Sequence, residues 1–213
     1  MIKGVIFDHD DVLAETEPLH CRSTIDALAR YGIALTEEVY YDFWTRRGGD
    51  LGKFLEERGI NADVKDIRRT GRRAYQQRLY EKLTPLNESD KVVRDLSAAY
   101  SLAVASGSYR PDVELSLRLM NVFQYFKVII TIEDVTNGKP HPESLLLACQ
   151  KMDIPPEEAL VIDDAEKGII AAKAAGMKSI AIPTSRTTHH NFSMATLVLD
   201  DIRKLTPELV STL

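Results

Sequence analysis

Short apolar runs alternate with amphipathic segments over the second half of this 213-residue chain, and this alternation most limits the folds open to it. The apolar runs are bounded by Ser, Gly, Asp or Pro, as strands often are. They cover residues 102–105, 128–131, 159–162 and 179–182. Helical patterns cover residues 110–120, 142–152 and 165–175. Strands that alternate with helices predict an α/β fold, with a Rossmann-like core of parallel strands and helices on both faces.

Residues 17–82 interrupt this rhythm, because their pattern is helical throughout. The expected helices cover residues 19–31, 36–45, 52–58 and 63–83. An all-helical block inserted after the first strand predicts a separate cap domain. We therefore expect a discontinuous core of residues 1–16 and 83–213, and a cap of residues 17–82.

Two side-chain clusters stand out within the expected cap. Aromatic residues gather at Tyr40, Tyr41, Phe43 and Trp44, a grouping more typical of a cap core than of a stacking platform. Arginines recur along residues 68–78 and make one helix basic in an acidic protein. Such a run can steer anionic substrates, although it is more often a solvated face.

Composition excludes several classes of protein. A net charge of −5 argues against a general nucleic-acid binder. The N-terminus lacks a signal peptide, and no apolar run approaches the roughly 20 residues of a membrane span. Cys21 and Cys149 lack CxxC spacing, so neither a disulfide framework nor a zinc site is indicated. We expect a cytoplasmic protein, a monomer or weak dimer, without nucleic-acid or membrane partners.

Three carboxylates follow the first apolar run directly, at Asp8, Asp10 and Asp11. Two like charges about 4 Å apart repel by roughly 4 kcal/mol at an effective dielectric near 20. A divalent cation such as Mg²⁺, which prefers oxygen ligands, would offset this repulsion. A turn is the alternative explanation, but a turn needs one Asp only. Ser106 and Asp163 also follow apolar runs, and the carboxyl ends of parallel strands form the ligand site in such folds.

Four motifs in order resemble those of the haloacid dehalogenase-like hydrolase superfamily. The resemblance extends to its branch with a helical cap after the first motif, which includes beta-phosphoglucomutase. The motifs cover nearly the whole chain, at residues 7–13 (FDHDDVL), 104–108 (VASGS), 138–143 (GKPHPE) and 161–177, which opens with VIDDA. This resemblance implies a phosphohydrolase that uses Mg²⁺ and acts on a small phosphorylated metabolite.

The resemblance also implies roles for individual residues. Asp8 would be the nucleophile that forms an aspartyl-phosphate, and Asp10 the general acid and then base. The implied Mg²⁺ ligands are the carboxylates of Asp8 and Asp164 and the backbone carbonyl of Asp10. Asp163 would contact the ion through a water molecule or support these ligands without touching the ion. Phosphate contacts are implied for Ser106, Gly107 and Lys139. Taken singly, Ser106 could form a turn, Lys139 could lie on the surface, and the Asp163 and Asp164 pair could cap a helix.

The cap offers fewer signals of substrate contact. Arg47 and Gly48 belong to a segment that resembles the cap loop that closes over substrate in this branch, and His20 matches a histidine of the first cap helix. A second anionic group on the substrate could be contacted by Arg46, Arg47 and Arg110. A solvated basic loop and a packed histidine are the alternatives.

Asp11 departs from the family pattern, which usually has Gly at this position. Asp tolerates left-handed backbone better than most residues, so we expect the turn to survive and the Asp11 side chain to point outward. The predicted function is a Mg²⁺-dependent phosphatase, with a sugar phosphate as substrate. A beta-phosphoglucomutase-like hexose-phosphate mutase is one alternative. The other is a non-catalytic phosphate-binding homologue, for which Asp11 is the main support.

Overall fold

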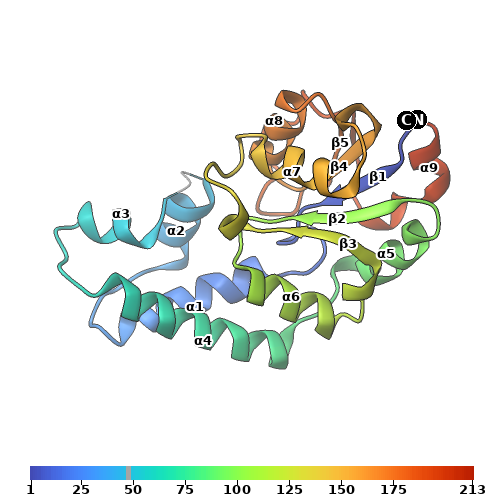
Figure 1. Ribbon diagram of the computed structural model, residues 1–213. Helices are drawn as coiled ribbons and strands as arrows, with labels where there is room; N and C mark the ends of the chain where they lie inside the picture. The colour runs from blue at the N-terminus through green and yellow to red at the C-terminus, as the bar shows by residue number, and fades with distance from the viewer. Residues whose placement is uncertain (47–48) are drawn as a thin grey trace. The chain divides into compact units, whose positions relative to one another are not determined.

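The computed structural model describes residues 1–46 and 49–213 and separates the chain into two compact units. Residues Met1–Glu15 and Thr84–Leu213 form the core unit, and Thr16–Leu83 form the helical unit. The core unit contains a six-stranded sheet whose strands all run parallel, in the order β3-β2-β1-β4-β5-β6. The expected α/β core is therefore confirmed (Figure 1).

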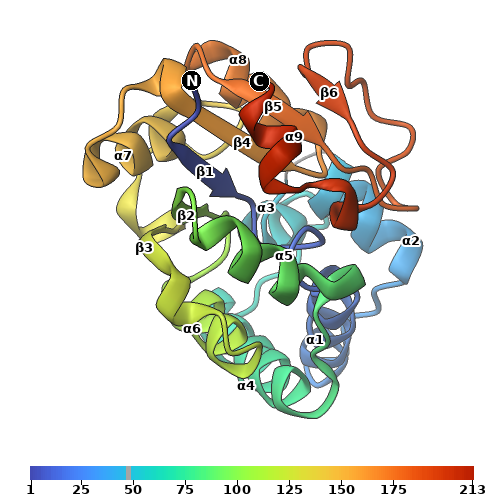
Figure 2. The ribbon, with the colours of Figure 1, turned by 90° about the vertical axis from the view of Figure 1, so that its right-hand side faces the viewer.

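The strands of the core unit are short and mostly buried, as expected for strands covered on both faces. They are β1 (Gly4–Phe7), β2 (Ser101–Ala105), β3 (Phe126–Ile130), β4 (Ala159–Asp163), β5 (Lys178–Ala181) and β6 (Leu197–Val198). The helices are α5 (Ser89–Ser97), α6 (Arg110–Leu119), α7 (Glu143–Met152), α8 (Glu166–Ala174) and α9 (Pro207–Ser211). Figures 1 and 2 show α7 and α8 on one face of the sheet and α5 and α6 on the other.

Each face of the sheet is sealed by apolar contacts, because successive side chains of a strand point to opposite faces. On one face, Ile6 and Val161 pack with Leu145 and Met152 of α7 and with Ala172 of α8. Successive strands are added to one side of β1 as far as β3, and from β4 onward to its other side. Ligands of doubly wound folds bind where the order changes in this way, here between β1 and β4. Asp8 follows β1 directly, Asp163 is the last residue of β4, and Asp164 follows it.

The helical unit comprises α1 (Glu17–Ala29), α2 (Glu37–Tyr40), α3 (Leu51–Glu56) and α4 (Val64–Lys82), with a π-helical segment η1 (Tyr41–Arg46) after α2. The expected helix over residues 36–45 is thus an α-helical turn that continues as a π-helix. Tyr40 and Phe43 are buried, and the Tyr40 ring stacks on Trp44. These aromatic side chains form the core of this unit, as predicted.

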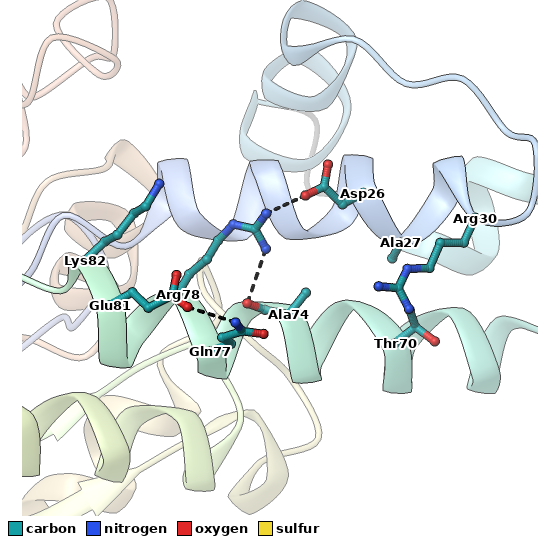
Figure 3. A pocket seen from close by; sticks show the side chains of 9 residues that line it. All are labelled: Asp26, Ala27, Arg30, Thr70, Ala74, Gln77, Arg78, Glu81 and Lys82. Atoms are coloured by element: carbon teal, nitrogen blue, oxygen red, sulfur yellow. Dashed lines mark hydrogen bonds and ion pairs between the residues drawn. The ribbon is translucent and has the colours of Figure 1, made fainter.

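The basic run of α4 is held by partners within the helical unit. Figure 3 shows a groove between α1 and α4 in which Arg78 reaches Asp26 and the Ala74 carbonyl. Arg69 pairs with Asp66, and Arg68 lies 3.4 Å from Asp50. The Arg78 and Arg68 pairs join α4 to α1 and to the start of α3, whereas the Arg69 pair lies within α4. All three are exposed enough to contribute little stability each. None of the described helices combines the length and the apolar composition that a membrane crossing requires.

Candidate active site

Asp8, Lys139 and Asp163 meet at the carboxyl edge of the sheet. Asp8 is placed directly after β1, where its backbone N–H donates to the Ile162 carbonyl of β4 at 2.8 Å. The Lys139 ammonium donates to Asp8 Oδ1 and to Asp163 Oδ2, each at 2.7 Å. All three side chains are at least 87% buried, since their exposed fractions are 7%, 13% and 2% for Lys139, Asp8 and Asp163. The sequence-predicted residues of three motifs are thus brought together.

The electrostatics of this trio are dominated by burial. Burial raises the pKa of Asp8 to about 6, while Lys139 opposes the rise and the carboxylates of Asp163 and Asp10 add to it. Burial would lower the pKa of Lys139, but the two facing carboxylates raise it above its ordinary value. Lys139 therefore keeps its proton and provides a fixed positive charge beside Asp8.

Glu143, the first residue of α7, anchors the loop that carries Lys139. Its carboxylate accepts from the backbone N–H of Thr136 at 2.8 Å and of Asn137 at 3.0 Å, and from the Asn137 side chain at 2.9 Å. These bonds, the Thr136 bond first, lower the pKa of Glu143. An ionised Glu143 thus closes the loop and directs the Lys139 side chain into the site.

Asp10 is held by three side chains. Its Oδ2 accepts from Ser108 Oγ at 2.6 Å and from Ser106 Oγ at 3.3 Å, and its Oδ1 lies 3.1 Å from Nδ1 of the fully buried His9. Ser106 in turn accepts the backbone N–H of Ser108 at 3.0 Å. Neither His9 nor Ser108 was predicted as a partner of Asp10. The repeated serines of the second motif were a signal for Ser108, whereas nothing in the sequence indicated which way His9 would point.

Asp163 and Asp164 contact different groups. Asp163 uses Oδ2 for Lys139 and Oδ1 for the backbone N–H of Ala165, at 2.9 Å. Asp164 accepts from the buried Thr187 hydroxyl at 3.4 Å. Burial raises the pKa of Asp164 well above its ordinary value, and the charges of Asp163, Asp8 and Asp11 add to this effect. Asp164 thus lies among carboxylates, and a cation bound there would stabilise its charged form.

Gly168 leaves room for the Asp163 carboxylate. A Cβ atom added at Gly168 would collide with the Cγ and both Oδ atoms of Asp163. Since Asp163 positions Lys139, the absence of a side chain in the first turn of α8 is a requirement of the site. The fourth motif contained Gly168, but its contact with Asp163 emerges only in three dimensions.

We therefore expect Gly168→Ala to lower the phosphatase activity that the motifs predict by roughly 10- to 100-fold and to lower the melting temperature, because overpacking of this kind costs about 1–3 kcal/mol. Hydrolysis rates and thermal melts of the purified variant check this. Gly71→Ala is the matched control, because its Cβ would meet Ala27 Cβ at 3.4 Å, an ordinary contact. Equal behaviour of the two variants would contradict a role for Gly168 in positioning Asp163.

The prediction that the Asp11 side chain points outward is wrong. Its side chain does not point outward but is 6% exposed, and it pairs with Arg186, whose Nη2 lies 2.8 Å from Asp11 Oδ2. The backbone of Asp11 is left-handed, with φ of 57°. The turn therefore survives as expected, while the side chain takes the opposite direction because a guanidinium from a distant loop neutralises it.

The remaining predicted residues belong to the core unit, to the helical unit or to the part of the chain outside the described residues. Gly107 follows Ser106, and among the described residues nothing lies within 4 Å of a Cβ built on it. His20 belongs to the helical unit, where its ring stacks on Tyr75 with centroids 3.7 Å apart. Arg47 and Gly48, with the side chain of Arg46, fall outside the described residues. Arg110 donates to Asp134 at 2.6 Å and to the Ile129 carbonyl at 3.0 Å, and so supports the end of β3.

The donor set at this edge suits Mg²⁺. It consists of carboxylate and carbonyl oxygens, the ligands that this ion prefers. Within residues 1–46 and 49–213, no three His, Cys, Asp or Glu side chains are grouped as a metal site by themselves. Mg²⁺ usually keeps several waters and takes one or two protein carboxylates. Asp8 and Asp164 fit that requirement, because they are mostly buried carboxylates that follow the paired strands β1 and β4.

Comparison with known proteins agrees with this geometry. The sequence profile described as haloacid dehalogenase-like hydrolase matches residues 5–182. Protein CbbY of Cereibacter sphaeroides is 32% identical, over 96% of this chain and 94% of CbbY. Fructose-1-phosphate phosphatase YqaB of Escherichia coli is 28% identical, over 84% of this chain and 95% of YqaB.

Solved structures give the same result. The crystal structure of CbbY from Rhodobacter sphaeroides in complex with phosphate superposes with a TM-score of 0.85 at 29% identity, and the match covers 96% of both chains. A likeness of this quality over the whole chain includes the helical unit as well as the sheet. The chain therefore belongs to the haloacid dehalogenase-like hydrolase family, in its CbbY-like branch with a helical cap, and it is a hydrolase of the phosphatase type.

Proposed function

We propose that this protein is a Mg²⁺-dependent phosphatase of a small sugar phosphate, and that it works through an aspartyl-phosphate on Asp8. The observation that carries the proposal is the buried Lys139 bridge between Asp8 and Asp163, with Asp10 held next to them by Ser106 and Ser108. This arrangement supplies a nucleophile, a fixed positive charge and a second carboxyl group within one site.

In the first step, an oxygen of Asp8 attacks phosphorus, and the bond from phosphorus to the sugar oxygen breaks. Asp10 donates its proton to that leaving oxygen. In the second step, Asp10 takes a proton from water, and the resulting hydroxide attacks phosphorus and releases Asp8 and inorganic phosphate. The contacts of Asp10 with Ser106 and Ser108 hold its carboxyl group in position for both transfers.

Lys139, Ser106 and Gly107 are the proposed phosphate contacts. Lys139 is charged and buried beside Asp8, so it would stabilise the equatorial oxygens during transfer. The Ser106 hydroxyl and the Gly107 backbone N–H follow β2 at the same edge, where they can donate to phosphate. We propose Asp8, Asp164 and the Asp10 carbonyl as Mg²⁺ ligands, with Asp163 holding Lys139. When bound, Mg²⁺ would neutralise phosphoryl oxygens and draw the substrate toward Asp8.

A sugar phosphate is proposed as substrate because of what two relatives bind or cleave. CbbY has been crystallised with xylulose-(1,5)bisphosphate, and YqaB is named a fructose-1-phosphate phosphatase. We further propose that residues 17–82 act as the cap that selects the sugar, with Arg47, Gly48 and His20 as its contacts. The non-catalytic alternative loses its main support, because Asp11 is neutralised by Arg186.

A panel of phosphorylated compounds tests the proposal. The panel contains pentose, hexose and triose phosphates together with pyrophosphate and phosphoglycolate, each assayed for inorganic phosphate with Mg²⁺ and with EDTA. We expect phosphate release from sugar phosphates with Mg²⁺ only, and none from an identically purified Asp8→Asn variant. No release from any compound would contradict the proposal. An isomerised sugar phosphate in place of inorganic phosphate would instead establish the mutase alternative.

A further inference from the structure

We propose that Arg186 is a positioning residue that neutralises Asp11 and keeps this carboxylate away from the bound cation, so that Asp8 and Asp164 alone supply carboxylate ligands. This inference rests on the proposed function, because it assigns Arg186 a role toward the same Mg²⁺ site.

The contact between Arg186 and Asp11 has the form of a buried counter-ion pair. Arg186 Nε and Nη2 lie 2.9 and 2.8 Å from Asp11 Oδ2, and Nη2 also lies 3.3 Å from Glu15 Oε1. Asp11 is 6% exposed, whereas Arg186 is 23% exposed and Glu15 52%. A buried carboxylate without such a partner would be strongly unfavourable, and a nearby cation would attract it.

The backbone of Asp11 adopts a conformation that is unusual for a residue with a side chain. Its φ of 57° lies in the left-handed region, which non-glycine residues rarely adopt. Its N–H donates to the Ala14 carbonyl at 2.9 Å and closes a tight turn one residue after Asp10. The turn thus combines an unfavourable backbone conformation with a buried charge. The ion pair with Arg186 offsets the free-energy cost of both.

The loop that supplies Arg186 also contacts Asp164. The Thr187 hydroxyl donates to Asp164 at 3.4 Å and accepts the Thr184 N–H at 3.0 Å. The Thr187 backbone N–H donates to the Thr184 carbonyl at 3.0 Å. Neighbouring residues of one closed turn therefore contact two different carboxylates, those of Asp11 and Asp164.

This turn lies beyond the part of the chain that the family profile covers. The match includes Asp11 but ends at residue 182, four residues before Arg186. The pair therefore joins a residue of the family's first motif to a residue outside the family profile.

The double variant Asp11→Gly/Arg186→Gln, compared with Arg186→Gln alone, tests the inference. Two quantities are measured for each protein: kcat/KM with the best panel substrate, and the Mg²⁺ concentration that half-saturates the rise in melting temperature without substrate. We expect Arg186→Gln to bind Mg²⁺ roughly tenfold more tightly, because Asp11 becomes an additional carboxylate near the cation, and to lose roughly 10- to 100-fold in kcat/KM. The double variant should recover both values, because Gly suits the left-handed turn.

Arg203→Gln is the matched control, because Arg203 makes an exposed pair with Asp201 in the same unit at 2.6 Å. It should leave both quantities unchanged. A loss of melting temperature alone in Arg186→Gln, with kcat/KM and Mg²⁺ half-saturation unchanged, would show a purely structural pair and overturn the inference. A protein that responds to Mg²⁺ but releases no phosphate would overturn only the proposed function, whereas no Mg²⁺ response in any variant would overturn both.

Discussion

Asp8→Asn is expected to abolish phosphate release, with a loss of at least about 10⁴-fold, because the amide cannot serve as the nucleophile. The substitution keeps the shape of a side chain that is 13% exposed and bonded to Lys139 at 2.7 Å. A loss of activity in this variant therefore reflects lost chemistry rather than lost packing. Mass spectrometry of acid-quenched protein provides the direct measurement, since only the unaltered chain should gain one phosphoryl group, on the peptide that contains Asp8.

Stability supplies an independent measurement on the same variant. Burial raises the pKa of Asp8 from 3.8 to about 6, so the native state holds this proton more firmly than the unfolded chain does. Stability contributed by protonated Asp8 is present below pH 4 and is lost as pH rises through 6. Without Mg²⁺, the unaltered protein should lose up to about 3 kcal/mol relative to Asp8→Asn over this interval. Denaturant unfolding at several pH values measures the difference, and a difference that does not depend on pH would contradict the assignment.

Lys139→Met is expected to have the second-largest effect. It would leave the carboxylates of Asp8 and Asp163 facing each other without the ammonium that lies 2.7 Å from each. Removing one partner of a buried ion pair typically costs about 3–5 kcal/mol. We expect phosphate release to fall by about 10³-fold, because the fixed charge that stabilises the transferred group is also lost.

A second substitution separates these two effects of Lys139. The double variant Lys139→Met/Asp163→Asn removes one of the opposed charges and should recover most of the melting temperature while hydrolysis stays low. Lys204→Met is the matched control, since Lys204 is 59% exposed and pairs with Asp200 at the surface. Recovery of activity together with stability in the double variant would show that Lys139 only supports the fold.

The sheet and the main site residues could be predicted from the chain because both depend on local patterns. Apolar runs of strand length alternating with helical periods leave few folds other than a parallel sheet between helices. Parallel strands end at one edge, so residues that follow them are brought together whatever the details of packing. This is why Asp8 and Asp163 meet at this edge, whereas Lys139, nine residues after β3, was expected there from the family resemblance alone.

Other features were decided by tertiary structure alone. The motifs could not show that His9 and Ser108 hold Asp10, or that Gly168 leaves room for Asp163, because these contacts depend on how neighbouring loops pack. Asp11 is the clearest case, since its partner Arg186 lies 175 residues away. A local pattern specifies that a turn forms after β1. The direction of the Asp11 side chain depends on where a distant guanidinium is placed, because a carboxylate is buried only where an opposite charge can neutralise it.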